Sequence, residues 1–152
     1  MNITVLCVGG IKEKFFKDAC GEYAKRISRF GKLNIYEAEE CHTGGQQDKE
    51  KEGKLLIKKI NKSSLVIALC VEGKKCSSEG LAELINGAGI NGKSEVTFII
   101  GGSEGLSDEV KNMADVRLSF SDMTFPHQLM RVVLLEQVYR AFKINSGEKY
   151  HK

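Results

Sequence analysis

The chain has no long apolar run, only one proline and no recognisable linker. No apolar stretch approaches the roughly 20 residues that a membrane helix needs. The apolar run Met1–Val8 is too short for the core of a signal peptide with its flanks, and it indicates a first strand. No internal repeat divides the 152 residues. We therefore expect a single domain over residues 1–152, in a cytoplasmic protein without a membrane partner.

The cysteines exclude a disulfide framework and offer no metal site. There are five, an odd number, and no two are spaced as CxxC. Cys7 and Cys70 fall in strand-like runs and are interpreted as small buried hydrophobes. Cys41 and His42 form one adjacent pair, but no second ligand pair stands at zinc-like spacing. We expect no bound metal.

The overall charge is too small to define a nucleic-acid-binding protein. The formal net charge is +3, with 28% charged residues. The basic residues are nevertheless unevenly placed, because many gather on two predicted helices. They are Lys12, Lys14, Lys17, Lys25, Arg26 and Arg29 on the first, and Lys54, Lys58, Lys59 and Lys62 on the second. Such stripes fit either an RNA backbone or ordinary solvated helix faces.

Apolar runs and helical periodicity alternate along the chain. Strands are predicted over 2–8, 33–38, 65–71, 96–100 and 116–119, and several of them are continuously apolar, as expected of strands covered on both faces. Helices are predicted over 12–30 and 49–61, from Ser77 or Ser78 to the glycines after Ile85, from Ser107, and from Pro126 onward. This alternation predicts an α/β fold with a mainly parallel sheet, although it equally allows a flavodoxin-like strand order.

Two of the predicted helices carry informative apolar faces. In the helix over 12–30, residues at three- and four-residue steps predict one buried stripe; they are Phe15, Phe16, Ala19, Tyr23 and Ile27. The last helix has an apolar surface wider than one stripe, which favours a partner, here a second subunit. Its apolar residues are Leu129, Val132, Val133, Leu135, Val138 and Phe142.

A glycine-rich turn follows the fourth strand directly. Val96–Ile100 leads into the segment GGSEG at 101–105, after which Ser107 is placed to cap a helix. Glycines allow a tight bend and close approach of a ligand to the backbone. The GGxxG spacing is a poor dinucleotide fingerprint, because it lies late in the chain with no acidic strand end after it. The turn is either a ligand cradle or only a tight strand-to-helix connection.

Three segments carry a resemblance to a known family. FIIGGSEGLS, LSFSDMTFPHQLMRVVLLEQVYRAF and the tail GEKYHK closely resemble the RlmH (YbeA-like) family, in the SPOUT class of S-adenosylmethionine-dependent RNA methyltransferases. The resemblance covers essentially the whole chain. It implies a mainly parallel, five- to six-stranded α/β sheet flanked by helices, with a C-terminal trefoil knot and a homodimeric assembly. It also implies methylation of N3 of a pseudouridine in 23S ribosomal RNA, within the large subunit of the assembled ribosome.

The resemblance further implies a cofactor site for S-adenosylmethionine in three loops at the carboxyl ends of strands. Open α/β sheets generally bind ligands there. The matching residues are Leu69, Gly101, Gly102, Phe120, Ser121, Asp122, Met123, Thr124 and Phe125. Backbone groups of these turns can read the adenine edge, while Leu69, Met123 and Phe125 enclose the ring. Without the resemblance, a second interpretation is open, in which Phe120, Met123 and Phe125 only fill the hydrophobic core.

Candidate catalytic residues lie on the last helix and in the tail. Glu136 or His151 is interpreted as the base that removes the N3 proton, and Arg131 as a group that stabilises charge on the flanking carbonyls. Tyr150 can stack on a nucleobase. Glu136 is also spaced to form an ion pair with Arg140. Where many family members have Asn-His-Pro before the tyrosine, this chain has 147–149 as Gly-Glu-Lys.

Two rival functions are distinguishable from the enzyme. A non-catalytic ribosome- or RNA-binding factor would keep the fold and the basic stripes but would have no affinity for the cofactor. A flavodoxin-like nucleotide-binding domain would bind a mononucleotide or flavin and would have no knot. The intact segments GGSEG, SFSDMTFPH and YHK favour the enzyme over both.

Overall fold

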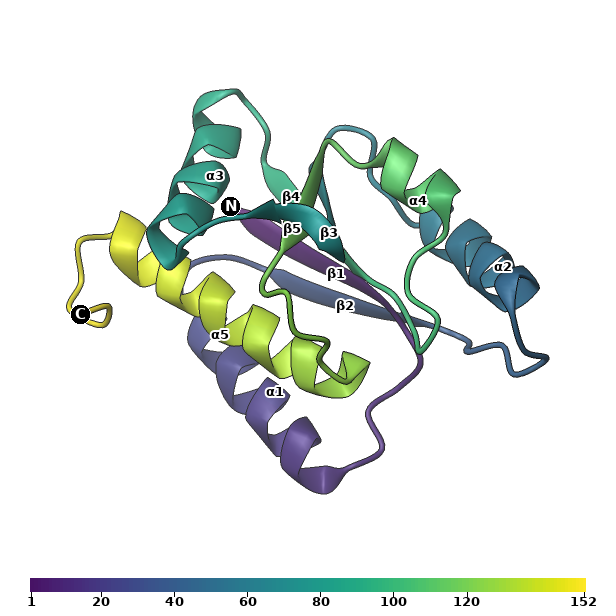
Figure 1. Ribbon diagram of the computed structural model, residues 1–152. Coiled ribbons are helices and arrows are strands. Elements are labelled where there is room, and N and C mark those ends of the chain that lie inside the picture. Colours follow the sequence, from purple (N-terminus) through teal and green to yellow (C-terminus); the bar gives the residue numbers. More distant parts are fainter.

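The protein is built on a five-stranded sheet in which all the strand pairs are parallel. A computed structural model describes all residues 1–152. The strands are β1 (Asn2–Val8), β2 (Leu33–Ala38), β3 (Leu65–Lys75), β4 (Glu95–Ile100) and β5 (Val116–Ser119). Their order across the sheet is β2-β1-β4-β3-β5 (Figure 1). The predicted α/β class and parallel sheet are confirmed, with five strands.

Five helices cover the two faces of the sheet (Figure 1). They are α1 (Lys14–Ile27), α2 (Gln46–Ile57), α3 (Ser78–Ile90), α4 (Asp108–Met113) and α5 (His127–Asn145). Helices α1, α3 and α5 contribute to one apolar cluster, and α2 and α4 to a smaller one. Alternate β1 residues divide between them: Ile3 and Val5 join the first cluster, and Leu6 and Val8 the second. Strand β1 therefore has both faces buried, as its continuous apolar run predicts, whereas the edge strand β2 is largely exposed.

The boundaries of several elements differ from the prediction; the helix predicted over 12–30, for example, spans Lys14–Ile27. The predicted strand 65–71 continues to Lys75, with an irregular register against β5 between Leu69 and Lys74. Gly73 makes this possible, since a Cβ there would lie 2.7 Å from the Leu118 backbone. Helix α2 begins at Gln46 rather than at residue 49. Asp48 lies inside its first turn, where it is buried and accepts hydrogen bonds from Thr43 Oγ1 and Gly44 N–H.

The predicted buried stripe of α1 is wrong at its N-terminal end. Ile27 is fully buried, and Tyr23 packs against the main cluster. Phe15, in contrast, is 64% exposed, and its ring pairs with that of the neighbouring Phe16, with ring centroids 4.4 Å apart. The stripe is correct where α1 lies over the sheet and fails in its first turn. That turn therefore leaves an aromatic side chain uncovered by the rest of the subunit.

No helix in the structure is both long enough and apolar enough to span a membrane.

The prediction that Cys7 and Cys70 are both buried is half correct. Cys7 is buried, and burial raises the pKa of its thiol to about 12. Cys70 is only half-buried, and its side chain lies at the wall of a cavity.

Candidate functional site

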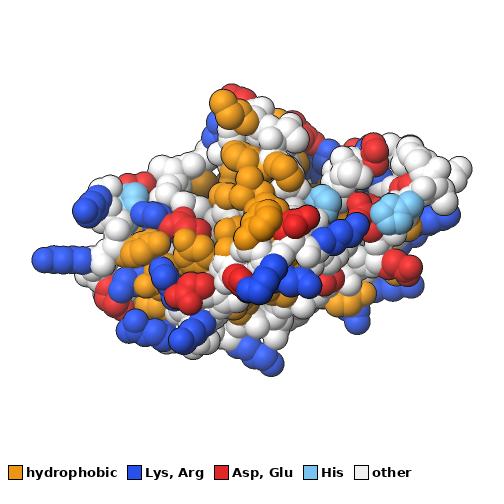
Figure 2. Space-filling model, turned by 90° about the horizontal axis from the view of Figure 1, so that it is seen from below, with side chains coloured by type: hydrophobic (Ala, Val, Ile, Leu, Met, Phe, Trp, Pro, Cys, Tyr) orange, Lys and Arg blue, Asp and Glu red, His pale blue; other side chains and the backbone are white.

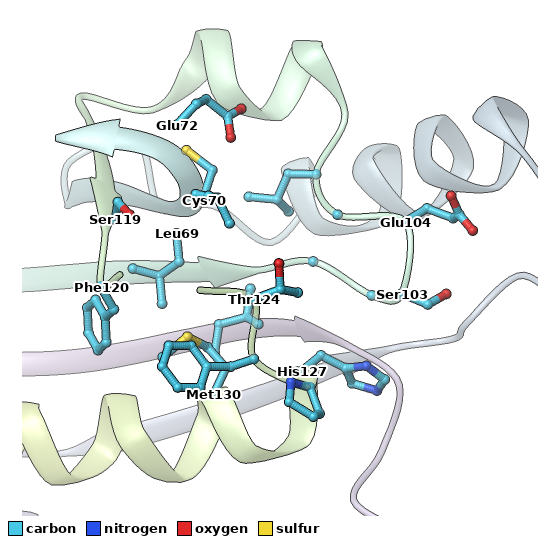
Figure 3. Close-up of a pocket in the computed structure, with 18 of the residues that line it drawn as sticks. Leu69, Cys70, Glu72, Ser103, Glu104, Ser119, Phe120, Thr124, His127 and Met130 are labelled. Atoms are coloured by element: carbon cyan, nitrogen blue, oxygen red, sulfur yellow. The ribbon is translucent and has the colours of Figure 1, made fainter. Parts of the chain in front are cut away.

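A cavity of about 700 Å³ lies at the carboxyl ends of the strands. Its wall comes from the end of β3, the turn after β4, the loop between β5 and α5, and the first turn of α5 (Figure 3). Leu69, Phe120, Thr124, His127 and Met130 approach it from these different elements. A cavity of this size accommodates a cofactor-sized ligand. Its position follows the general rule for open parallel sheets.

The glycine-rich turn forms one rim of this cavity through its backbone. Gly105 N donates to the Gly102 carbonyl at 3.1 Å, and Gly105 has a φ of +78°. A Cβ on Gly101 would lie 2.5 Å from the carbonyl carbon of Gly105. A Cβ on Gly102 would lie 3.0 Å from Val8 and 3.4 Å from Glu52. The turn therefore has this shape only with glycine at position 101.

The cavity combines an apolar lining with charged groups at its edge. Leu69 and Met130 are among its apolar side chains. At the edge, Lys111 forms an ion pair with Glu72, and the hydrogen bond from Lys111 is the main cause that lowers the pKa of Glu72. An apolar pocket with a few polar groups is typical of small-molecule sites. The arrangement suits a ligand with one flat aromatic part and one polar part.

The structure brings together eight of the nine residues predicted to hold the cofactor. Leu69, Gly101, Gly102, Phe120, Ser121, Met123, Thr124 and Phe125 all line the cavity. Asp122 does not line it, because its side chain forms an ion pair with Lys75 outside. The loop is shaped by two bonds of Ser121: its carbonyl accepts from Ser119 Oγ at 3.0 Å, and its hydroxyl accepts from Met123 N at 3.0 Å.

A second cluster of polar groups surrounds Glu136, in the middle of α5. The predicted ion pair with Arg140 is present, with Arg140 Nη2 2.5 Å from Glu136 Oε1. Tyr150 OH donates to the same oxygen at 3.2 Å, and Gln137 Nε2 donates to Glu136 Oε2 at 2.7 Å. The ring of Tyr150 packs edge-on against Tyr139 at 4.9 Å. Burial is the main cause that raises the pKa of Tyr150, so its hydroxyl stays a donor at neutral pH.

The C-terminal tail is held against the domain by its histidine. His151 Nε2 lies 2.7 Å from Glu79 Oε1 at the start of α3, and His151 Nδ1 lies 3.2 Å from Arg140 Nη1. Hydrogen bonds to Glu79 lower the pKa of its carboxyl to about 2, first from its own backbone N–H and then from His151. Three of the four predicted catalytic residues, Glu136, Tyr150 and His151, are thereby brought together.

Arg131, the fourth predicted catalytic residue, lies apart from this cluster. Its side chain is 1% exposed, forms an ion pair with Glu37 and donates from Nη2 to the Gly9 carbonyl at 2.8 Å. Its Nε has no partner. A guanidinium buried behind β1 and β2 cannot contact RNA from this position. The structure instead places Arg131 as a link between α5 and the ends of those strands.

Several residues of the cavity were not predicted. Met130 and His127 line it because α5 begins at the cavity wall, and Lys49 reaches it from α2. Glu52, also on α2 but not part of the cavity lining, is 4% exposed, accepts from Cys41 N at 3.1 Å, and has its pKa raised mainly by burial. Its position in a highly charged helical segment hides this burial from sequence reasoning. No group of three or more His, Cys, Asp or Glu side chains is arranged to hold a metal ion.

A parallel sheet with a glycine turn and two loops around one cavity defines an α/β domain with a ligand site at the carboxyl ends of its strands. The family described as "Predicted SPOUT methyltransferase" matches residues 1–151. The chain belongs to the SPOUT methyltransferase family and, within it, to the RlmH family. It is 55% identical to the ribosomal RNA large subunit methyltransferase H of Clostridium novyi and 50% identical to that of Acetivibrio thermocellus, over the full length of each protein.

Solved structures with the same fold are much more distant in sequence. A probable methylase family protein from Haemophilus influenzae has a TM-score of 0.54 at 12% identity, covering 99% of this chain and 70% of that one. The tRNA (m1G37) methyltransferase from Aquifex aeolicus has a TM-score of 0.51 at 15% identity, covering 92% and 70%. These likenesses establish the SPOUT-type fold. The trefoil knot stays a prediction.

Proposed function

We propose that this protein methylates N3 of a pseudouridine in 23S ribosomal RNA, with S-adenosylmethionine as the methyl donor. The substrate is the large subunit within the assembled ribosome, and the reaction takes place in the cytoplasm. The observation that carries the proposal is the convergence of Leu69, the 101–105 turn and the 120–125 loop on one cavity. The relatives named above, similar over their full length, support the same reaction on ribosomal RNA.

The cavity fits this cofactor. The turn at 101–102 offers backbone groups without side chains in the way, and Leu69 and Met130 supply an apolar surface for a flat ring. When bound, S-adenosylmethionine supplies an activated methyl group, so the protein contributes mainly position and the exclusion of water. Leu69, Gly101 and Gly102 hold the ligand, together with the 120–125 loop except Asp122.

The protein must also accept the proton that leaves N3 of the base. The Glu136 carboxylate is the acceptor that the geometry favours. It is held in place by hydrogen bonds from Arg140, Tyr150 and Gln137. His151, which lies beside Arg140, is the alternative acceptor. A positioned acid or base of this kind contributes a rate factor of about 100 to 10,000.

A homodimer completes this proposal. Phe15 is 64% exposed on α1, and Figure 2 shows a band of apolar side chains on the face seen from below, where α1 and α5 lie. Contiguous apolar side chains exposed on one face often mark interaction sites. Glu136 lies nine positions after His127, which is at the cavity wall, and therefore about 14 Å further along the helix axis. Pairing two subunits through this face would bring one tail toward the other subunit's cavity.

The proposed activity is tested by methyl transfer to ribosomes from a strain that lacks this protein. Labelled S-adenosylmethionine is supplied, and the product is located by RNA digestion and mass spectrometry. We expect one methylated pseudouridine in large-subunit RNA. If the RNA stays unlabelled after incubation with folded, dimeric protein, the proposed methyltransferase activity is contradicted. Ribosome binding without cofactor affinity would then support the non-catalytic binding factor.

The role of the tail gives a separate prediction. Tyr150→Ala removes both the hydroxyl that donates to Glu136 and the ring that packs on Tyr139. We expect methyl transfer to fall about 100-fold, the lower end of what a positioned acid–base system contributes. Tyr150→Phe, which keeps the ring, should lose less. Tyr36→Phe on β2 is the matched control and should transfer methyl groups at the wild-type rate. Wild-type transfer by Tyr150→Ala would exclude a catalytic role for the tail.

A further inference from the structure

A second, smaller cavity adjoins the large one. Its volume is about 220 Å³, and it shares Phe120 and Phe125 with the large cavity as a common wall. The rest of its lining comes from the start of α3 and the middle of α5; these residues are Cys76, Ser77, Ser78, Leu81, Val133 and Gln137. A ligand in the smaller cavity would therefore lie directly beside a ligand in the larger one.

The lining of this smaller cavity is suited to a flat ring with polar edges. Phe120, Phe125, Leu81 and Val133 provide aromatic and aliphatic surfaces, while polar groups stand on the α3 and Gln137 side. Enzymes that modify a base in RNA or DNA take it out of its stack into a close-fitting pocket between such side chains. The size and the composition both favour a single nucleobase over a second cofactor.

The amide of Gln137 is held in one orientation by two neighbours. Ser78 Oγ donates to Gln137 Oε1 at 2.6 Å, and Gln137 Nε2 donates to Glu136 Oε2 at 2.7 Å. An amide group has two N–H donors and two acceptor lone pairs on its oxygen. One N–H and one lone pair therefore remain free. Gln137 offers a ligand one donor and one acceptor side by side.

We propose that the smaller cavity holds the target base and that Gln137 recognises the N1–H and C2 carbonyl edge of pseudouridine. This inference rests on the proposed function. Pseudouridine is joined to its ribose through C5, so its N1–H is free, whereas N1 of uridine carries the sugar. The Gln137 oxygen accepts from N1–H, and its free N–H donates to the C2 carbonyl. N3, on the other side of that carbonyl, is left unpaired and can face the larger cavity.

The arrangement also connects the base to the Glu136 cluster through the Gln137 amide. The same Gln137 amide that contacts the base donates to Glu136, which in turn accepts from Tyr150. Gln137 is thus a specificity-determining residue that connects the base pocket with the Glu136 cluster. Each bidentate contact of this type discriminates against the wrong base by about 10- to 100-fold.

The test compares two ribosome substrates in the same labelled-methyl assay. One carries the pseudouridine, and the other comes from a strain without the pseudouridine synthase and carries uridine. We expect wild-type protein to prefer pseudouridine by at least about 10-fold and Gln137→Met to lose most of that preference. The affinity of Gln137→Met for S-adenosylmethionine, measured by calorimetry, should equal that of the wild-type protein. Gln47→Met, on the exposed side of α2, is the matched control and should keep the preference.

A second variant tests the cavity itself. Val133→Phe adds a ring to the half-buried lining and should slow transfer to both substrates without changing cofactor affinity. Full preference for pseudouridine in Gln137→Met, or wild-type transfer in Val133→Phe, would overturn the inference. Wild-type protein that methylates neither ribosome would instead contradict the proposed function. The two failures are therefore distinguishable.

Discussion

Gly101→Ala is expected to weaken binding of S-adenosylmethionine by about 10-fold, the effect of losing one backbone hydrogen bond of roughly 1.4 kcal/mol. The added Cβ would lie 2.5 Å from the carbonyl carbon and 2.6 Å from the carbonyl oxygen of Gly105. These atoms are backbone, so no side-chain rotation relieves the overlap. The turn must open, which displaces the backbone groups proposed to hold the ligand. Calorimetric titration of the variant with S-adenosylmethionine measures the effect.

A matched variant separates this effect from a general intolerance of added methyl groups. Gly87 lies in α3, and a Cβ there meets nothing within 4 Å. Gly87→Ala should bind the cofactor normally and unfold with a free energy higher by about 0.5–1 kcal/mol, because alanine favours the helix over glycine. Urea unfolding of both variants shows whether Gly101→Ala is still folded. Normal cofactor affinity in folded Gly101→Ala would contradict the proposed role of the turn.

The apolar pattern predicted most of the fold because it reflects burial on two faces. Continuous runs such as Leu65–Val71 and Val96–Ile100 fell on central strands, β3 and β4, which helices cover on both sides. The predicted cap of α3 is also confirmed, since Ser77 Oγ accepts from Gly80 N. Both signals are local in sequence. Neither depends on which strands become neighbours.

The pattern failed where a tertiary contact overrides a local signal. β3 continues past Val71 because it pairs again with β5 through Lys74 and Lys75. Phe15 matches a helical stripe but lies beyond the sheet, so the subunit leaves it exposed. In both cases the outcome depends on whether another element packs against the residue, and the residue type does not reveal this. Spacing alone cannot distinguish the two situations.

The sequence predicted the backbone turn of the candidate site but not the burial of the charged side chains around it. A glycine pair at a strand end is visible in the sequence, and the structure places it on the cavity. The partners of Arg131 and Glu52 are not visible. Arg131 pairs with Glu37, 94 residues earlier in the chain, and Glu52 is buried within a segment rich in charge. Buried charges are identified by their partners, which only the fold brings together.

Arg131 therefore yields a prediction about stability. Arg131→Met keeps an unbranched side chain but removes the ion pair with Glu37 and the hydrogen bond to the Gly9 carbonyl. Breaking a buried ion pair by removing one partner costs about 3–5 kcal/mol. We expect the lower end, about 3 kcal/mol, since the Glu37 side chain is 46% exposed and can be rehydrated. Urea unfolding at neutral pH measures the loss.

Arg140→Met is the comparison that separates structure from chemistry. Arg140 also forms an ion pair on α5, with Glu136, but its side chain is 24% exposed. Its removal should cost less stability than that of Arg131, about 1–2 kcal/mol for hydrogen bonds to a charged group, while reducing methyl transfer, because Arg140 holds the proposed proton acceptor. Arg131→Met should therefore lose mainly stability, whereas Arg140→Met should lose mainly methyl transfer. An Arg131→Met protein of wild-type stability that transfers no methyl group would instead restore Arg131 to the reaction, since its link to β1 and β2 would then be energetically unimportant.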